Sequence, residues 1–340
     1  MIKEAIIKLV DGTSLDQDEA AQVMEEIMAG TATAAQMGAF LTVLRLKGET
    51  VEEIAGLAAT MRARAIPVAT SRTVVDTCGT GGDGCGTFNI STAAAFVAAA
   101  CGVAVAKHGN RAMSSTCGSA DVLEALGANV SLPAEEVALC LEEVGLGFMF
   151  APMFHPAMRH AIGPRRELGF RTVFNVLGPL TNPAGARAQV LGVPDAVLAE
   201  KMARALQRLG THHALVVHGS DGLDELTVSG PSVVYEVVDG DVRGYDVRPE
   251  DFGFEPSPLS AIVGGSPEVN AAIIRSVLAG EPGPRRQVVV LNAAAALVAG
   301  DVAPDLQTGV ALASQAIDSG EAAALLDRFV QHTHREAVPC

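Results

Sequence analysis

The sequence predicts an α/β protein, with a small, mostly helical N-terminal domain and a larger α/β domain whose central, mainly parallel sheet is covered by helices. Apolar side chains recur at helical spacing over the first 66 residues, and strand-like and helix-like runs then alternate from residue 72 to about 160. Such alternation favours a parallel sheet that is buried on both faces. We expect a helical domain over residues 1–67, completed by helices from about 160–190, and an α/β domain over residues 68–340.

The N-terminal segment carries signals that begin and end helices. A side-chain acceptor followed three residues later by Glu predicts a capping box, and a glycine after an apolar-periodic run predicts a helix end. The positions are Asp16 with Glu19, Thr50 with Glu53, and the glycines Gly30 and Gly48. We therefore expect a helical bundle here that packs a core and offers a face for dimer formation.

The stretch from Gly79 to Thr92, GTGGDGCGTFNIST, follows a short strand at Val74 and Val75 and leads into an alanine-rich helix. Glycine reaches positive φ and lets backbone N–H groups approach a ligand closely. The N–H groups at the start of the following helix favour an anion. The order strand, glycine loop, helix therefore predicts a phosphate-binding cradle, and a tight turn without a ligand is the alternative.

Better-known phosphate loops fit this stretch less well. Gly79, Gly81 and Gly84 match G-x-G-x-x-G, but a dinucleotide site also requires an acidic residue at the end of the next strand. That strand, Val103 to Ala106, is followed by Lys107 instead. A Walker A loop would close with G-K-[ST], which is not present here.

A second group of polar residues follows that strand. Lys107–Arg111 reads KHGNR, and MSSTCGSAD leads into a helix at Asp121. Two successive βα loops thus place Lys107, Arg111 and several serines at the carboxyl edge of the sheet, where open α/β sheets bind ligands. Cations with hydroxyls and amides suit several phosphates at once. His108 lies within this set, and packing is its alternative role.

The segments DTCGTGGDG, FNIST, KHGNR, SADVLEALG, FNVLGPLTNP and DGLDEL, in this order, resemble the anthranilate phosphoribosyltransferases. The resemblance covers essentially the whole chain. It implies transfer of a phosphoribosyl group from phosphoribosyl pyrophosphate, the donor, to the amine of anthranilate, the acceptor, in tryptophan biosynthesis. It also implies magnesium, with two ions per monomer, and a homodimer formed through the N-terminal helices.

The resemblance also implies site residues. The donor would be bound by Gly79, Gly82, Asp83, Thr87, Asn89, Ile90, Ser91, Thr92, Lys107, His108, Gly109, Asn110, Arg111, Ala112, Met113, Ser114, Ser115 and Ser119. The acceptor would be bound by Gly79, Asn110, His155 and Arg165, and the metal by Ser91, Asp224 and Glu225. Packing is the alternative role for His155.

Asp224 and Glu225 stand in GSDGLDEL, after the strand ALVVH. Adjacent carboxylates at a strand's carboxyl edge are typical magnesium ligands when a substrate phosphate completes the shell. From the residues alone a solvated acidic turn is the alternative, and the family pattern favours the metal site.

Arg165 follows Pro164 in PRRELG, and its guanidinium suits a benzoate carboxylate. Because proline restricts the residue before it, we expect Pro164 to shape a turn at Gly163. The acceptor's amine is a weak base, so catalysis by positioning and electrostatics is expected, with no acid, base or nucleophile assigned.

The composition of the chain disfavours several classes of protein. A net charge of −15 argues against a nucleic-acid-binding protein. The longest apolar run, Ala93 to Ala106, is too short to cross a membrane, and the N-terminus has no signal-peptide core. Six cysteines without a C-x-x-C pair indicate reduced thiols and a cytoplasmic location.

Three other functions remain to be weighed. A pyrimidine nucleoside phosphorylase would share the fold, but should differ at KHGNR and at the acceptor arginine. A non-catalytic nucleic-acid-binding relative should be basic and lack the acidic pair. A dinucleotide-dependent oxidoreductase is disfavoured by Lys107.

The remainder of the chain supplies more strands and helices. Strands are expected at 189–193 and 214–217, and a hairpin over 232–247 turns at Asp239-Gly240-Asp241. Helices are expected over about 267–279, 286–299, 304–318 and 321–331.

Overall fold

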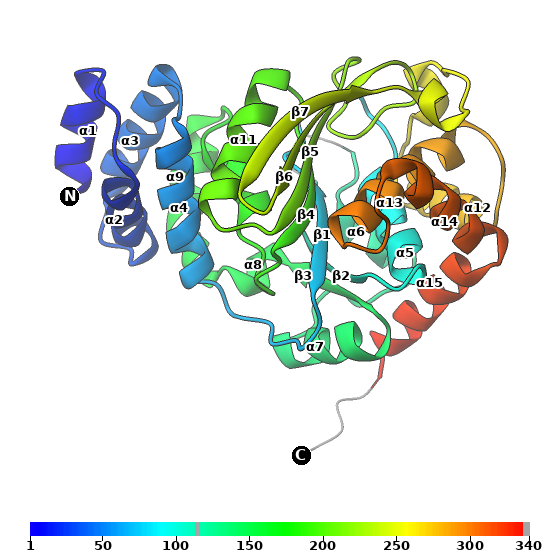
Figure 1. The fold of residues 1–340 in the computed structure, drawn as a ribbon. Helices are drawn as coiled ribbons and strands as arrows, with labels where there is room; N and C mark the ends of the chain where they lie inside the picture. The colour runs from blue at the N-terminus through cyan, green and yellow to red at the C-terminus, as the bar shows by residue number, and fades with distance from the viewer. Residues whose placement is uncertain (113–115, 336–340) are drawn as a thin grey trace.

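The computed structural model describes residues 1–112 and 116–335 and begins with four helices at one end of the molecule (Figure 1). They are α1 (Ile2–Val10), α2 (Gln17–Met28), α3 (Ala34–Lys47) and α4 (Val51–Ala63). The capping boxes at Asp16 and Thr50 are confirmed, and Thr33 with Gln36 makes a third one at the start of α3. Gly48, with φ of 85°, ends α3 as expected.

The α/β part contains one seven-stranded sheet with the order β3-β2-β1-β4-β5-β6-β7. Its strands are β1 (Val74–Gly79), β2 (Ala104–Gly109), β3 (Leu146–Phe150), β4 (Ala188–Gly192), β5 (His213–Gly219), β6 (Ser232–Val238) and β7 (Asp241–Val247). The first five run parallel, and β6 and β7 add antiparallel strands at one edge. The predicted mainly parallel sheet, and the hairpin at its edge, are confirmed.

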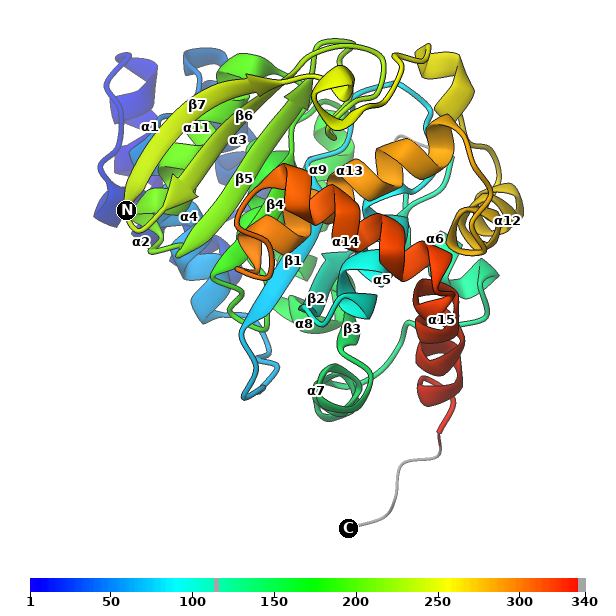
Figure 2. The same ribbon diagram turned by 45° about the vertical axis from the view of Figure 1, so that its right-hand side comes forward.

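Helices cover both faces of the sheet (Figure 2). On one side lie α5 (Ile90–Ala100), α13 (Pro284–Ala299) and α14 (Leu306–Asp318), with α6 (Ser119–Ala125), α12 (Pro267–Leu278) and α15 (Glu321–His332) beyond them. On the other lie α4 and α11 (Ala196–Arg208), and α7 (Ala134–Glu143) packs beside β3.

The side chains of β5 show how the strand pattern divides the core. Leu215 and Val217 belong to the cluster with α5 and α13, whereas Ala214 and Val216 belong to the cluster with α11 and the N-terminal helices. This alternation follows from the two-residue period of a strand. Burial of apolar surface on both faces explains why the strand reads as an unbroken apolar run.

The segment after β3 returns to the N-terminal helices. It contains α8 (Ala151–Phe154), α9 (Arg159–Leu168) and α10 (Phe174–Leu177). Ala161 and Phe174 share one buried cluster with Phe40 and Leu57 of the N-terminal helices. The packing of this segment thus joins residues that are more than a hundred positions apart.

Two local predictions were wrong. Pro164 does not form a turn: it lies inside α9, where packing against α2 and α3 holds the helix despite the hydrogen bond that proline removes. Lys107 and His108 do not follow β2 but belong to it, because the strand continues to Gly109. Both side chains are buried in the strand, with Lys107 bonded to the Thr77 carbonyl oxygen.

A partly buried ion-pair network lies at the amino end of β5. His213 contacts Glu236 of β6 at 2.9 Å and Asp301, after α13, at 3.0 Å. Arg243 of β7 donates to Glu236 at 2.8 Å. The hydrogen bond from His213 lowers the pKa of Glu236 to about 2. Burial opposes protonation of His213, but bonds to Glu236 and Asp301 outweigh it and raise the pKa of that imidazole.

These shifts predict a pH-dependent contribution to stability. The lowered pKa of Glu236 stabilises the fold fully above the unfolded pKa near 4.5, and this stabilisation is lost as the pH falls through about 2. The raised pKa of His213 stabilises the fold fully below the unfolded pKa of 6.5. This stabilisation is lost as the pH rises through the higher folded pKa. Glu236→Gln should therefore cost about 2 kcal/mol of unfolding free energy at pH 5.5 and less at pH 9.

Denaturant unfolding at the two pH values would measure this difference. Glu200→Gln is the control, because Glu200 pairs with Arg204 on the exposed surface of α11. A cost for Glu236→Gln that stays constant from pH 5.5 to pH 9 would contradict the assignment.

Candidate functional site

The carboxyl ends of the parallel strands meet at one edge of the sheet. β1 ends at Gly79, β2 at Gly109 and β4 at Gly192, and Gly79 and Gly192 are paired neighbours. We call the segment Gly79–Thr87, which leaves β1 and leads to α5, the glycine loop. The predicted donor-binding residues of the glycine loop therefore lie at the carboxyl edge of the sheet, as expected.

The backbone of the glycine loop explains most of its glycines. Gly81, Gly82, Gly84 and Gly86 all have positive φ, between 62° and 78°. Gly79 does not, and its reason is different: a Cβ there would overlap the carboxylate of Asp224. Glycine is thus required by conformation at four positions and by a close neighbour at the fifth.

The far end of the glycine loop is anchored by the segment before α12. The N–H of Gly264 donates to the carbonyl oxygen of Gly86 at 2.9 Å, and Thr87 forms a bridge with Val263. Asn270, which is buried in α12, donates from Nδ2 to Oδ1 of Asn89 at 3.0 Å. The donor site therefore depends on residues that lie some 180 positions further along the chain.

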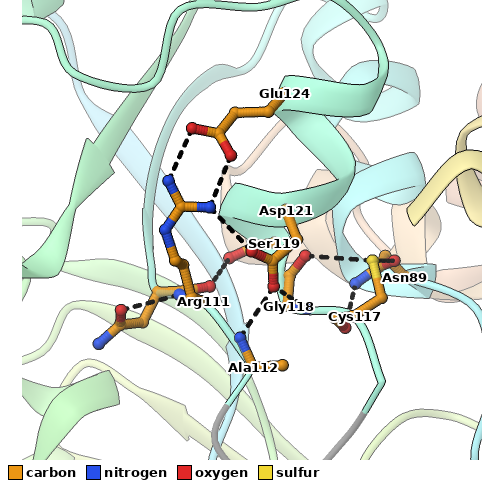
Figure 3. A network of polar contacts seen from close by, with 9 residues as sticks. Asn89, Arg111, Ala112, Cys117, Gly118, Ser119, Asp121 and Glu124 are labelled. Carbon is orange, nitrogen blue, oxygen red and sulfur yellow. Dashed lines mark hydrogen bonds and ion pairs between the residues drawn. The ribbon is translucent and has the colours of Figure 1, made fainter. Parts of the chain in front are cut away.

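The side chain of Asn89 is held by three contacts to protein partners. Its Oδ1 accepts from Asn270. The same Oδ1 accepts from the Cys117 thiol, and its Nδ2 donates to the carbonyl oxygen of Cys117 at 3.1 Å (Figure 3). These contacts fix the orientation of the half-buried Asn89 side chain, and its role in donor binding stays a prediction. Neighbouring Ile90 and Thr92 are buried, so their contact with the donor stays a prediction.

Asp224 and Glu225, the acidic pair, lie in the loop after β5 and cross over the ends of β1 and β4. The carboxylate of Asp224 accepts from the N–H of Gly81 at 2.8 Å, and that of Glu225 accepts from the N–H of Ser91 at 3.2 Å. A Cβ at Gly192 would overlap the carbonyl oxygen of Asp224. The structure thus brings the predicted metal ligands Ser91, Asp224 and Glu225 together.

Burial shapes the charge of this pair. It raises the pKa of Glu225 to about 7, with Lys107 opposing the rise, and raises the pKa of Asp224 well above its usual value. Asp83 lies near both carboxyls and raises their pKa values further. Without a bound cation these shifts favour the protonated acids, and a cation bound here would favour the two carboxylates. Among the described residues neither acid has an ion-pair partner within 4 Å.

Lys107 lies beneath the glycine loop with 3% of its surface exposed. Its ammonium group donates to the carbonyl oxygen of Thr77 and, at 3.4 Å, to the hydroxyl of Ser91. Burial lowers its pKa. Lys107 is therefore placed to affect the donor site through Ser91 and through its charge.

Arg111 is engaged elsewhere. Its guanidinium contacts Glu124 at 2.6 and 2.7 Å and Asp121 at 3.0 Å, all on α6 (Figure 3). Asp121 also accepts from the N–H groups of Ala112 and Gly118. Two carboxylates already balance the charge of Arg111, so a phosphate would have to compete with them. The role of Arg111 in donor binding stays a prediction.

The second βα loop is closely packed around Gly109. A Cβ at Gly109 would overlap the hydroxyl of Ser119, which donates to the carbonyl oxygen of Asn110 at 3.3 Å. Ser119 therefore lies directly beside the end of β2. The predicted donor-binding residues Met113, Ser114 and Ser115 lie outside the described residues.

A cavity of about 700 Å³ opens between the carboxyl edge and the returning segment, and we call it the acceptor cavity. Three of the predicted acceptor-binding residues line it: Asn110, His155 and Arg165. Gly79 does not, although its neighbour Thr80 does. Met61 of α4 contributes to the wall, so both parts of the chain form this cavity.

Two histidines face each other in the acceptor cavity. The rings of His108 and His155 lie 5.1 Å apart between centroids. Burial lowers the pKa of His108 to about 3 and that of His155 to about 4. Both imidazoles are therefore neutral at pH 7, which suits contact with an uncharged amine and a ring.

Arg165 supplies a cation to the same cavity. It lies on α9, with its guanidinium 5.0 Å from the ring centroid of Phe174. Burial lowers its pKa, but an arginine remains charged at pH 7. A guanidinium beside an apolar, aromatic wall suits an aromatic carboxylate.

Two residues that support the site, Asn182 and Asn270, were not predicted from the sequence. Asn182 donates to the buried Asp76 at 2.7 Å and to the carbonyl oxygen of Ala106 at 2.8 Å. FNVLGPLTNP was noted only for its resemblance, although a polar residue in an apolar turn is a usable signal. Asn270 carried no signal, because only the fold brings α12 to Asn89.

Comparisons with known proteins agree with this architecture. Residues 71–323 match the model of the glycosyl transferase family a/b domain, and residues 3–65 match that of its helical bundle domain. An anthranilate phosphoribosyltransferase of Chloroflexus aggregans is 62% identical over 338 residues, covering 99% of both chains. One of a Roseiflexus species is 60% identical over 332 residues, covering 97% of both.

Solved structures give the same picture. The crystal structure of anthranilate phosphoribosyltransferase from Thermus thermophilus is 50% identical, with a TM-score of 0.92, over 97% of this chain and 99% of that one. The Saccharomyces cerevisiae enzyme in complex with PRPP and Mg is 28% identical, with a TM-score of 0.90, over 98% and 97%. These findings confirm the resemblance on which the site prediction rested. The chain belongs to the anthranilate phosphoribosyltransferase family of glycosyl transferases.

Proposed function

We propose that this protein transfers the phosphoribosyl group of 5-phosphoribosyl 1-pyrophosphate to the amine of anthranilate, giving N-(5-phosphoribosyl)anthranilate and pyrophosphate, in tryptophan biosynthesis. One observation carries the proposal: an acidic pair held over a glycine loop adjoins a cavity that presents Arg165. Together these features provide for a metal-bound polyphosphate and for an aromatic carboxylate.

The names of related structures support both substrates. One Saccharomyces cerevisiae structure contains PRPP and Mg, and another, 27% identical with a TM-score of 0.87, contains 4-fluoroanthranilate. Membership of the family also disfavours the nucleoside phosphorylase and nucleic-acid-binding alternatives, since the matched relatives are named anthranilate phosphoribosyltransferases.

The proposed donor site is the predicted set at the carboxyl edge, arranged around the glycine loop and the start of α5. Backbone N–H groups at the helix start favour the anionic donor. The proposed acceptor site is the cavity lined by Asn110, His155 and Arg165, with Gly79 at its border. His108, which lines the same cavity, would contact both substrates.

Magnesium fits the residues present. Ser91, Asp224 and Glu225 offer hard oxygen ligands. Half-buried Asp224 and buried Glu225 lack an ion-pair partner within 4 Å among the described residues. We propose two ions per monomer, which would neutralise charge on the pyrophosphate leaving group. Among the described residues no group of three or more His, Cys, Asp and Glu forms a metal cage, so donor oxygens would complete the coordination.

Catalysis would rest on placement and charge. Bond breaking at the anomeric carbon leaves negative charge on the leaving group, which loop amides and Lys107 stabilise. Neutral His108 and His155 let the uncharged amine approach. Arg165 orients the acceptor by its carboxylate.

We further propose a homodimer formed through the N-terminal helices. Ile7 and Val10 of α1 are 63% and 65% exposed, and Leu46 of α3 is 81% exposed. Exposed apolar side chains of this kind are favoured at subunit contacts. The boundary near residue 67 between a helical and an α/β domain is part of the same proposal.

A cytoplasmic location also stays a proposal. Cys78, Cys85, Cys101, Cys117 and Cys140 are free thiols, which fits a reducing compartment. Within residues 1–112 and 116–335, no helix is both long and apolar enough to cross a membrane.

The acidic pair gives the first test of the function. Asp224→Asn combined with Glu225→Gln should lower activity on the order of a thousandfold, because the pyrophosphate charge loses its metal-mediated neutralisation. Anthranilate fluorescence, followed with the donor across a magnesium titration, measures the loss. The control is Glu135→Gln with Glu136→Gln, an adjacent acidic pair in the first turn of α7. Wild-type magnesium dependence in the Asp224/Glu225 variant would refute the metal assignment.

Arg165 gives a second test. Arg165→Ala should raise the KM for anthranilate about 30-fold or more, since removal of one partner of a buried charge pair costs about 2 kcal/mol or more. The KM for the donor should change far less. Arg204→Ala, on the exposed side of α11, is the control. A larger rise in the donor KM would instead place Arg165 in the phosphate site.

The glycine loop gives a third test. Gly81→Val should abolish donor binding because its φ of 62° is strained for a β-branched residue, and Gly79→Val should do so by displacing Asp224. Asp83→Ala should weaken binding less, since the loop path is kept. Calorimetry with the donor and magnesium measures each affinity.

Gly12→Val is the matched control, because Gly12 also has positive φ, 77°, in open space but lies between α1 and α2. Wild-type donor affinity in either loop variant, with native circular dichroism, would show that the glycine loop is not the phosphate site.

A further inference from the structure

Arg171 lies between the two proposed substrate sites. It belongs to the segment that links α9 to α10, and its side chain lines the acceptor cavity. The same guanidinium donates from one nitrogen to the carbonyl oxygen of Thr80 at 3.2 Å. Arg171 therefore contacts the glycine loop from the acceptor side.

The contact with the glycine loop is closer than a hydrogen bond alone requires. A Cβ at Gly82 would overlap the guanidinium of Arg171, so a backbone without a side chain faces the arginine there. Gly82 also has φ of 78°, which a side chain rarely adopts. Two independent constraints, one conformational and one steric, therefore meet at Gly82.

The charge of Arg171 is not balanced by a carboxylate. Of the residues that the structure describes, no Asp or Glu lies within ion-pair distance of it, in contrast to Arg111, which two carboxylates hold on α6. A half-buried cation that touches the backbone of a phosphate-binding loop is available to that loop.

We propose that Arg171 is a positioning residue for the donor. It acts through Thr80 and Gly82, fixing the path of the glycine loop so that its amides face the pyrophosphate. Because Arg171 belongs to the segment that forms the acceptor cavity, it also links the shape of one site to the other. This inference rests on the proposed function only for its kinetic part.

Hydrogen exchange tests the positioning role without any substrate. Arg171→Ala should speed exchange of the glycine-loop amides about tenfold or more, while amides of β5 keep wild-type rates. Arg171→Lys, which keeps a charge and a donor for Thr80, should restore part of the protection. Unchanged exchange of the glycine loop in Arg171→Ala would overturn the proposal.

Kinetics test the consequence for the donor. Arg171→Ala should raise the donor KM on the order of tenfold or more and the anthranilate KM by less, with partial rescue in Arg171→Lys. A rise confined to the anthranilate KM would make Arg171 an acceptor residue and overturn the proposal. If the wild-type protein turns over no anthranilate while the exchange result holds, the proposed function fails and the positioning role stands.

A double-mutant cycle separates the contact from general damage. Gly82→Ala suffers both strain at positive φ and overlap with Arg171, and Arg171→Ala removes the overlap. The donor-affinity losses in the double variant should therefore fall short of the product of the single losses. Losses that multiply would show independent action and contradict the proposal.

The control is Arg187→Ala. Arg187 also donates to a carbonyl oxygen, that of Gly210 at 3.1 Å, but it is exposed and precedes β4 at the opposite end of the sheet. It should leave the exchange of the glycine loop and the donor KM at wild-type values. An equal effect of Arg187→Ala would mean that loss of any arginine loosens the loop, which would overturn the assignment to Arg171.

Discussion

The passage of the acidic loop over the ends of β1 and β4 is the constraint on which the rest of the site depends. Asp224 comes so close to Gly79 and Gly192 that neither position has room for a Cβ. The carboxylates of Asp224 and Glu225 accept hydrogen bonds from backbone N–H groups of the glycine loop and of the start of α5. A single crossing thus places the proposed metal ligands, orients the loop and fixes the start of the helix.

A buried polar network supports this crossing from below. Asp76 accepts from the N–H of His108 at 3.1 Å and from Asn182 at 2.7 Å, and burial raises its pKa to about 6. Because buried polar groups are costly when unpaired, this network joins β1, β2 and the returning segment in one arrangement. The donor site and the acceptor cavity therefore share a common floor.

Local signals in the sequence predicted much of the fold and the position of the glycine loop. Capping residues located the N-terminal helices, and short apolar runs located strands of the parallel sheet. Two-residue alternation located the hairpin, and glycine content marked the glycine loop. What failed was the end of β2, because Lys107 and His108 look like loop residues until Thr77 and Asp76 supply their partners. Pro164 in α9 was missed for a similar reason: tertiary packing against α3 outweighs a local preference. The contacts of Asn270 and Arg171 join distant segments, and no spacing in one sequence reveals such contacts.

The link from Asn270 to Asn89 has a consequence for how the C-terminal region is regarded. Helix α12 contributes no proposed ligand, yet its buried amide fixes the residue that opens α5, and the preceding turn bonds to Gly86. The donor pocket is therefore a composite of the two ends of the α/β part. Selection for altered donor use would act on residues 262–270 as directly as on the glycine loop.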